Sequence, residues 1–478
     1  MARLIFGPWE PDKPGFLTES VQTANNVYAA TNGYRPIRQF VALAGGTLPA
    51  ACVGAGSFVS PVGTTTILAG TQAALYRARA TEWEAIGTGY SLQSGSRWRF
   101  AQYGSLAIAT NGIDPMLKID TQTSDVALLG AGAPDEAGTP PRARILAGVK
   151  DFLVAAVIDD DVRTLAWCGI NNAEWWTYGQ NQSDYQIMPS GGEITGLFGG
   201  EVGIVLQRSR ISRMTYVGDN IVFQFDEISS NVGCISPHST AQWGGLGFFR
   251  SDSGFMMWDG SGLRPIGQER VDRHFSSRYS RPDYDRMSTA IDPANNLVAW
   301  SMGDAIYFYN WVLDRWTISD FSASIIFPGF SRDISLDELD ALYGSLDAVP
   351  VSLDSPIFLG GDPRFYVFNQ ANTVGTFSGD TQAGTVRSTT FEPATGRSGR
   401  LRWTRPISDA ETISVGVTAR NRLGQTDAET VYPGMTASGD VAVRECGRFI
   451  TLALLFDAGS IWTYAQGLDY TIERGPVR

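Results

Sequence analysis

Short apolar segments dominate the chain, and most of them end at a glycine, an asparagine or an aspartate. Examples are the segments 66–69, 106–109, 152–157 and 306–309, in which β-branched and aromatic residues are frequent. Runs of this length and composition, bounded by turn residues, are typical of β-strands. The pattern therefore predicts an all-β protein.

Two segments have the features of short helices. Residues 336–343 follow Ser335, which is placed to form a capping box with Glu338, and a glycine comes directly after them. A capping box of this kind marks the start of a helix. Residues 268–275 carry two apolar side chains four positions apart, which places them on one helical face. Everything else favours sheet.

A repeat organises the strands between residues 41 and 378. An apolar strand, a glycine-containing turn and a second strand with a bulky marker residue recur, with gaps of 41, 50, 49, 42, 49 and 59 residues between successive markers. A degenerate period of 40–50 residues with strand hairpins is typical of propeller blades. We therefore expect a β-propeller of six to eight blades; a succession of ordinary antiparallel sandwiches is the alternative. The markers are Tyr76, Leu117, Trp167, Tyr216, Trp258, Tyr307 and Tyr366.

The two ends of the chain differ from this repeat. Residues 379–478 alternate cleanly between apolar and polar positions, as in Ile413, Val415 and Val417, which predicts a C-terminal antiparallel β-sandwich-like domain with one buried face. Residues 1–40 are rich in proline and asparagine and have no blade pattern. We expect them to form an N-terminal arm or packing segment.

Composition narrows the class of protein. Apolar residues make up 43% of the 478 residues and charged residues only 18%, which excludes a disordered chain. The net charge is −12, although proteins that grip nucleic-acid backbones usually carry a basic excess. Lysine occurs only at Lys13, Lys118 and Lys150, so the basic residues are almost all arginine. Tight DNA binding is therefore not expected, whereas a local arginine patch stays open.

Other features concern the compartment in which the protein is made. The four cysteines are scattered without a CxxC pair and are expected to be buried apolar residues. The first ten residues lack the pattern of a signal peptide, and no apolar run approaches the ~18 residues of a membrane helix. We expect synthesis in a reducing cytoplasm and no stable membrane insertion.

Candidate catalytic residues are few. His238 and His274 are the only histidines, and neither lies in a recognisable nucleophile motif, so each is expected to be structural. The aspartates at 159–161 are better explained as a hairpin tip than as a cation site, because three consecutive side chains cannot all face one ion. We predict no enzyme activity, no metal site and no cofactor.

Two propeller classes with known motifs fit poorly. The segment 252–258 approaches the Asp-box of sialidases, but Arg250 stands where serine is expected and the tryptophan comes one residue late. A WD40 scaffold is weakened because Trp258-Asp259 is the only Trp-Asp pair in the chain.

A tryptophan pair and an acidic segment are the remaining candidate sites. Trp175 and Trp176, in an asparagine-rich loop, are expected to form a blade core and an inter-subunit contact; the alternative is that they stack sugar rings. An acidic segment containing Asp337, Glu338 and Asp340 is either a solvated face or the lining of a passage for DNA.

Three groups of segments resemble structural tail proteins of short-tailed bacteriophages. The opening of the chain has a proline-rich "PW-PD-P" pattern followed by "A-NV" and "Y-P", and two later groups are also similar. The segments are GPWEPDKP at 7–14, ANNVY at 24–28 and NGYRP at 32–36; DSGF at 252–255, WDG at 258–260, PIG at 265–267 and VDRHF at 271–275; and YFYN at 307–310 and DRW at 314–316.

This resemblance implies a tail nozzle or tail-hub protein built on a β-propeller. Such a protein forms a homo-hexameric ring in the virion tail, below the portal and adaptor, and lines or gates the channel through which the genomic DNA leaves without being tightly bound. No catalytic residues belong to the pattern. Within the opening, Trp9, Tyr34 and Arg35 are the candidates for a contact with the ring or the adaptor. A glycan-binding or glycan-cleaving propeller at the host surface is the alternative function.

Overall fold

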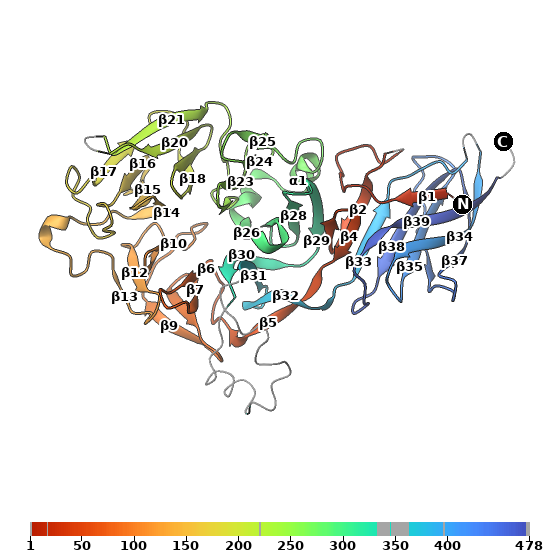
Figure 1. Cartoon of the computed structure of the whole chain (residues 1–478), viewed down its shortest axis with the longest axis horizontal. Coiled ribbons are helices and arrows are strands. Elements are labelled where there is room, and N and C mark those ends of the chain that lie inside the picture. The colour runs from red at the N-terminus through yellow and green to blue at the C-terminus, as the bar shows by residue number, and fades with distance from the viewer. Residues whose placement is uncertain are drawn as a thin grey trace.

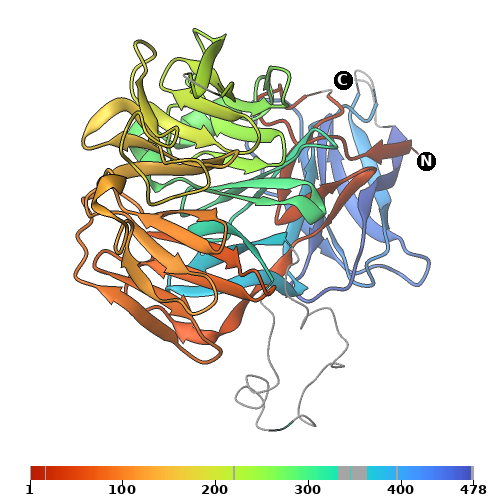
Figure 2. The same ribbon diagram turned by 60° about the vertical axis from the view of Figure 1, so that its left-hand side comes forward.

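The computed structural model describes residues 2–16, 18–218, 221–331, 345, 363–394 and 397–474. Seven four-stranded antiparallel units follow one another around an axis, and a second β domain lies beside them (Figures 1 and 2). The protein is therefore an all-β chain with a β-propeller, and seven blades lie within the predicted six to eight.

Each of the first six blades is a simple meander whose strands follow one another in the sequence. Blades one to three contain β6 (Gly54–Val59), β7 (Thr65–Gly70), β8 (Ala74–Ala78) and β9 (Trp83–Thr88); β10 (Arg99–Tyr103), β11 (Leu106–Thr110), β12 (Leu117–Asp120) and β13 (Val126–Leu128); and β14 (Ala143–Val149), β15 (Phe152–Ile158), β16 (Asp161–Trp167) and β17 (Asp184–Ile187). Blades four to six contain β18 (Ile194–Phe198), β19 (Gly203–Gln207), β20 (Ile211–Tyr216) and β21 (Phe223–Ser229); β22 (Ala241–Trp243), β23 (Leu246–Arg250), β24 (Phe255–Trp258) and β25 (Leu263–Pro265); and β26 (Ser288–Asp292), β27 (Leu297–Ser301), β28 (Ile306–Asn310) and β29 (Arg315–Ser319).

The seventh blade is closed by the N-terminal part of the chain. It contains β30 (Ala323–Phe330), β31 (Pro363–Asn369) and β32 (Thr373–Thr381), and its fourth strand is β5 (Arg38–Thr47). β5 pairs antiparallel with β32, for example at Phe40 and Phe377. The ring is thus sealed by a strand that precedes the first blade in the sequence.

Each marker residue lies in a different blade. Six of them lie on the third strand of their blade, and Tyr366 lies on β31, the second strand of the seventh. Such central strands are deeply buried, as in β28, which carries Tyr307 and is buried at all five positions. Blades stack face to face, so both faces of such a strand are covered and the apolar run is continuous.

The second domain is a sandwich of two sheets that enclose one apolar core. One sheet contains β1 (Ala2–Ile5), β3 (Val27–Ala30), β4 (Gly33–Pro36), β34 (Gly399–Ser408), β37 (Val441–Gly447) and β39 (Ala465–Arg474). The other contains β2 (Val21–Asn25), β33 (Gly384–Ser388), β35 (Ser414–Arg420), β36 (Thr430–Pro433) and β38 (Phe449–Phe456).

One sheet continues from the propeller into the sandwich. β29, the outer strand of the sixth blade, pairs in parallel with β2 at Ile318 and Asn25, and β2 pairs antiparallel with β33. The result is a nine-stranded sheet shared by both domains (Figure 1). A single cluster of buried side chains, which includes Trp300, Trp316 and Leu454, runs through this junction.

Several sequence predictions need correction. The N-terminal segment, expected to be an arm or packing segment, is part of both domains: its described residues supply β1–β4 to the sandwich and the start of β5 to the propeller. The helix expected at 268–275 is present but begins later: α1 spans Asp272–Arg278, because residues 268–271 form a turn. The helix expected at 336–343 lies outside the described residues. Short 3-10 helices occupy Asp135–Ala137, Arg281–Arg286 and Pro293–Asn295.

Candidate functional site

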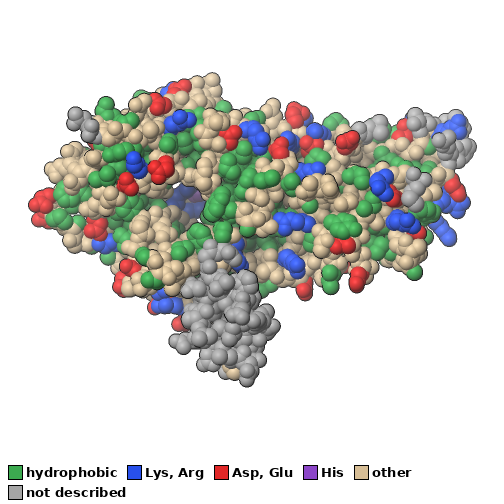
Figure 3. All heavy atoms as spheres, viewed as in Figure 1, with side chains coloured by type: hydrophobic (Ala, Val, Ile, Leu, Met, Phe, Trp, Pro, Cys, Tyr) green, Lys and Arg blue, Asp and Glu red, His purple; other side chains and the backbone are tan. Residues whose placement is uncertain are grey.

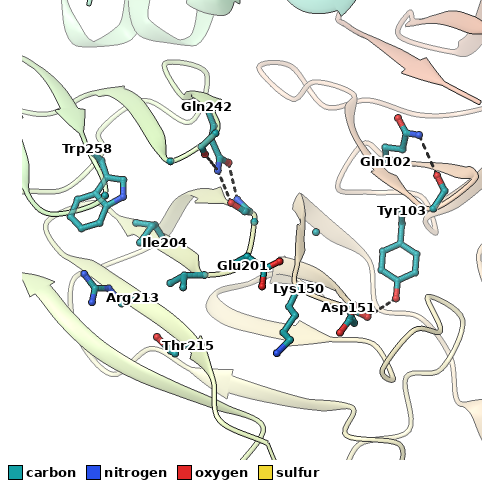
Figure 4. A pocket seen from close by; sticks show the side chains of 18 of the residues that line it. Gln102, Tyr103, Lys150, Asp151, Glu201, Ile204, Arg213, Thr215, Gln242 and Trp258 are labelled. Atoms are coloured by element: carbon teal, nitrogen blue, oxygen red, sulfur yellow. Dashed lines mark hydrogen bonds between the residues drawn. The ribbon is translucent and has the colours of Figure 1, made fainter. Parts of the chain in front are cut away.

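A wide cavity of about 1190 Å³ opens on one face of the propeller, which we call the face cavity. It is lined by the first hairpin turns of blades two to five and by side chains of β20 and β24 (Figure 4). Lys150 and Arg213 contribute positive charge to the lining, and Asp151 and Glu201 contribute negative charge. The lining therefore has balanced charge and no strong preference for either sign of ligand.

Two glutamines hold the walls of the face cavity in place. Gln242 on β22 accepts a hydrogen bond from the Gly199 backbone N–H (2.8 Å) and donates one to the Gly199 carbonyl (2.5 Å), which ties blade five to blade four (Figure 4). Gln102 on β10 ties blade two to blade one in the same way, by donating to the Val59 carbonyl at 2.7 Å. Both side chains are thus structural links between neighbouring blades.

Sequence reasoning missed these links, although the chain contains a signal for them. The six residues 101–106 read AQYGSL and residues 241–246 read AQWGGL, so the glutamine, the aromatic residue and the glycine recur at equivalent blade positions. The glycine lies at the tip of the first hairpin, where Gly104 and Gly244 have φ values of 58° and 55°. Few non-glycine residues adopt such φ values.

Basic side chains at the face cavity lie over aromatic rings in cation–π contacts. The Lys150 ammonium lies 4.3 Å from the centre of the Tyr216 ring, and the Arg213 guanidinium lies 5.9 Å from the centre of the Trp258 ring. Tyr103 donates its hydroxyl hydrogen to the Asp151 carbonyl at 2.6 Å, and burial raises the pKa of that phenol. The phenol therefore stays neutral.

The segments that carry the bacteriophage resemblance meet at a second place, the junction between blades five and six and the sandwich. The Trp9 ring lies edge-on to His274 with the ring centres 5.4 Å apart, and the Tyr307 hydroxyl lies 3.1 Å from His274 Nδ1. The Asp12 carboxylate accepts hydrogen bonds from the backbone N–H groups of Arg273 (2.8 Å) and His274 (2.7 Å) at the start of α1. All three groups of segments thus touch one another.

Further bonds extend this contact. The Trp316 indole donates to the Ile266 carbonyl at 2.8 Å, and Arg315 donates to the Ala30 carbonyl at 3.1 Å. Residues almost 300 positions apart in the sequence are therefore direct neighbours at the junction.

The predicted contact with a ring or adaptor is corrected for two of its three residues. Trp9 and Tyr34 are 3% and 0% exposed, and their polar atoms bond to the Gln22 and Gly7 carbonyls. Their side chains therefore fill the junction and are not available to another subunit. Arg35 is half-buried; it lies over the Tyr28 ring and donates to Asn295 at 2.8 Å.

Arginines of the junction are paired with carboxylates. Arg270 forms a two-bonded pair with Asp314, at 2.5 and 2.7 Å. Burial alone raises the pKa of Asp314, but the hydrogen bonds from Arg270 and Tyr309 outweigh it and hold the pKa below its ordinary value. The pair is therefore ionised at neutral pH.

The most buried of these pairs is Arg250 with Asp272. Arg250 is 2% exposed, lies over the Phe255 and Phe275 rings and approaches the Asp272 carboxylate at 3.3 Å. Asp272 also accepts a hydrogen bond from the Phe255 backbone N–H. Burial raises the pKa of Asp272 to about 6, although Arg250 and the Phe255 N–H act in the opposite direction.

The other predicted site residues lie elsewhere. Trp176 is 3% exposed and donates to the Ala173 carbonyl at 2.7 Å, so it belongs to the core of blade three and cannot stack on a sugar. Trp175 is half-buried beside it. Asp337, Glu338 and Asp340 lie outside the described residues. The aspartates at 159–161 do lie at the tip of the β15–β16 hairpin.

Cys52, Cys168 and Cys234 are buried as expected, whereas Cys446 is exposed. In the part of the chain that the structure describes, no three His, Cys, Asp or Glu side chains are grouped so that they could hold a metal ion. None of the helices within the described ranges is long and apolar enough to cross a membrane.

Comparisons with known proteins give similarity in fold only. No family model and no curated protein matches the chain. Similar solved structures include the extracellular domain of a one-component system from B. thetaiotaomicron (11% identity, 89% of this chain and 47% of that chain, TM-score 0.42). The Pan2 WD40 domain of Neurospora crassa is also similar (6% identity, 72% of this chain and 97% of that chain, TM-score 0.40). So are the RRP9 WD40 repeats (10% identity, 60% of this chain and 89% of that chain, TM-score 0.36). The chain spans about half of the length of the first of these proteins.

Proposed function

We propose that this protein is a structural component of a virion, a tail nozzle that forms a ring around the exit channel of a short-tailed bacteriophage. The observation that carries the proposal is the junction, where the three groups of resembling segments converge. Those segments bury Trp9, anchor Asp12 on α1 and pair Arg270 with Asp314. A resemblance concentrated in such a junction is what a shared architecture produces, whereas a shared reaction would concentrate it around reactive groups.

The shared nine-stranded sheet supports this role. Because β29 and β2 hydrogen-bond across the domain boundary, the propeller and the sandwich form one continuous unit. Building blocks of a ring must keep a fixed shape, and a propeller protects most of its strand edges by closing on itself. The net charge of −12 per chain also suits a channel past which DNA slides without adhering.

The test is the composition and structure of particles made by a host that carries the gene. We expect mass spectrometry of purified particles to detect this chain, and cryo-electron microscopy to show six copies in a ring at the tail. A chain that is expressed but absent from the particles would contradict the proposal.

Glycan binding is a second candidate, and one observation favours it. Tyr178 and Tyr185, next to the predicted tryptophan loop, are 41% and 47% exposed, with ring centres 5.0 Å apart. Exposed aromatic faces of this kind stack on sugar rings. The candidate site thus moves from Trp176 to these tyrosines.

A glycan array separates the two candidates. Under the second one, the full chain binds a defined set of glycans and Tyr185→Ala removes the binding, whereas Val162→Ala, a change at another exposed residue of blade three, leaves it intact. Silence across the array would remove glycan binding from consideration.

A further inference from the structure

A channel runs along the axis of the propeller, between the innermost strands of the blades. On one side it widens to about 320 Å³, lined by residues of β6, β10, β14, β26 and β30. On the other side it widens to about 140 Å³, where residues of β18 join the lining. Arg97, Arg99 and His238 border both spaces and therefore mark the middle of the channel. Figure 3 shows the hollow among the blades, with basic side chains inside it.

The two arginines are held by uncharged groups. Arg97 donates to the Asp285 backbone carbonyl at 2.8 Å, and Arg99 donates to the Pro237 carbonyl at 2.5 Å and to His238 Nδ1 at 3.3 Å. Within the described ranges, neither guanidinium has a carboxylate at ion-pair distance. This differs from the junction, where Arg250, Arg270 and Arg278 each have one.

His238 acts as an acceptor in this arrangement. Burial, with Arg97 and Arg99 nearby, lowers the pKa of His238 well below its ordinary value, so the ring is neutral. An arginine can only donate hydrogen bonds, hence His238 Nδ1 receives one from Arg99. The histidine orients Arg99 without neutralising it.

The channel therefore carries a net positive charge inside an acidic protein; the Asp285 carboxylate acts on Arg97 only from beyond ion-pair distance. The larger space has no acidic residue in its lining, and the smaller one has only Glu193, which pairs with Arg208 at 2.9 Å. Burial lowers the pKa of both Arg97 and Arg99 to about 10, and the proximity of Arg99 contributes to the shift of Arg97. Two recessed cations that border one narrow space are stabilised by an anion that binds between them.

We propose that the axial channel binds a small oxyanion, and that a phosphate group is its ligand, held by Arg97 and Arg99. Guanidinium groups form paired, planar hydrogen bonds with phosphate oxygens, which suits two arginines on one side of a narrow space. The larger space has room for a phosphate with a small organic substituent. The site is independent of the proposed function, because it lies within a single propeller.

Titration of the purified full chain with sodium phosphate tests the proposal. Chloride is exchanged for phosphate at constant ionic strength while the thermal midpoint and the heat of binding are measured. We expect a saturable rise in the midpoint, as for any ligand that binds only the folded state. Glycerol 3-phosphate is titrated in parallel: tighter binding assigns the site to a phosphomonoester, and weaker binding assigns it to the free ion. No saturable effect of either compound overturns the proposal.

Variants locate the site. Arg99→Gln and Arg97→Gln should each weaken binding roughly tenfold or more, because each removes a charge-assisted contact. Arg79→Gln, which removes the same charge from an exposed side chain of blade one, should leave the dissociation constant within about twofold of wild type. Equal weakening in all three variants would indicate screening by net charge and would overturn the assignment. Circular dichroism establishes that each variant is folded. His238→Asn, which replaces the hydrogen-bond partner of Arg99, should also weaken phosphate binding.

Discussion

The junction and the axial channel are built from the same kinds of residue but differ in how they treat charge. Each contains one of the two histidines, several aromatic rings and recessed arginines. In the junction Arg250 and Arg270 each face an aspartate. In the channel Arg97 and Arg99 face carbonyl groups and a neutral ring instead. Arginines paired with carboxylates stabilise the fold, whereas arginines without a carboxylate partner carry a charge that an anionic ligand can neutralise.

Breaking the most buried pair should give the largest effect. We expect Arg250→Met to lower the free energy of unfolding by about 3–5 kcal/mol, because it leaves Asp272 buried without its partner. Denaturation in urea, followed by tryptophan fluorescence, measures the change. The double variant Arg250→Met/Asp272→Leu should recover part of the loss, since no buried charge then remains. A double variant as unstable as the single one would contradict this account.

The same pair should give stability a characteristic pH dependence. The pKa of Asp272 is raised to about 6 in the folded protein, above the ~3.9 of an unfolded aspartate. The stabilisation that the protonated Asp272 gives to the folded state is therefore fully present below pH 4 and is lost as pH rises through 6. The loss amounts to about 2–3 kcal/mol. Asp272→Asn does not titrate, so its stability deficit relative to wild type should shrink between pH 4 and pH 7. Urea midpoints of both proteins across this range test it; a constant deficit would count against the raised pKa.

A smaller effect is expected where the N-terminal segment meets α1. Asp12→Ala removes the acceptor for two backbone N–H groups at the start of the helix and should cost about 1–2 kcal/mol. Thermal unfolding of the variant measures this. Asp252→Ala is the matched control, because Asp252 is an exposed partner of Arg281 and such pairs contribute less than about 1 kcal/mol. If the two variants lost the same stability, Asp12 would not be an anchor.

The channel arginines should matter least for stability. In chloride buffer, Arg97→Gln and Arg99→Gln should each stay within about 1 kcal/mol of wild type, because the lost hydrogen bonds are offset by the removal of a recessed charge that has no ion-pair partner. The measurement is again the urea midpoint. A loss as large as that of Arg250→Met would erase the distinction between the two regions.

Much of the fold followed from local sequence. The blade period identified the propeller because every blade repeats the same hairpins. The seven marker residues lie in seven different blades. The alternation around Val415 and Val417 likewise marked the sandwich, where one face of β35 is buried. Local patterns of this kind reflect burial, which acts on neighbouring positions of a strand.

The role of the first 40 residues did not follow, because it depends on partners far along the chain. β5 pairs with β32 and β1 pairs with β39, and nothing in the N-terminal sequence specifies those strands. For the same reason the burial of Trp9 was missed: its neighbours His274 on α1 and Tyr307 on β28 lie more than 260 residues further along the chain. The channel was missed because Arg97 and Arg99 are ordinary in sequence, and only ring closure brings them to His238.

Closure by β5 also sets the order in which the molecule can be completed during synthesis. β5 leaves the ribosome long before β32, and at about 5–20 residues per second it waits roughly 20–70 seconds for its partner. β1 waits longer still, since its partner β39 comes after β32 in the chain. Contacts so distant in sequence make folding slow. The earliest strands to be made are thus the last to be placed: the propeller can close only after β32 has been translated, and the sandwich only after β39.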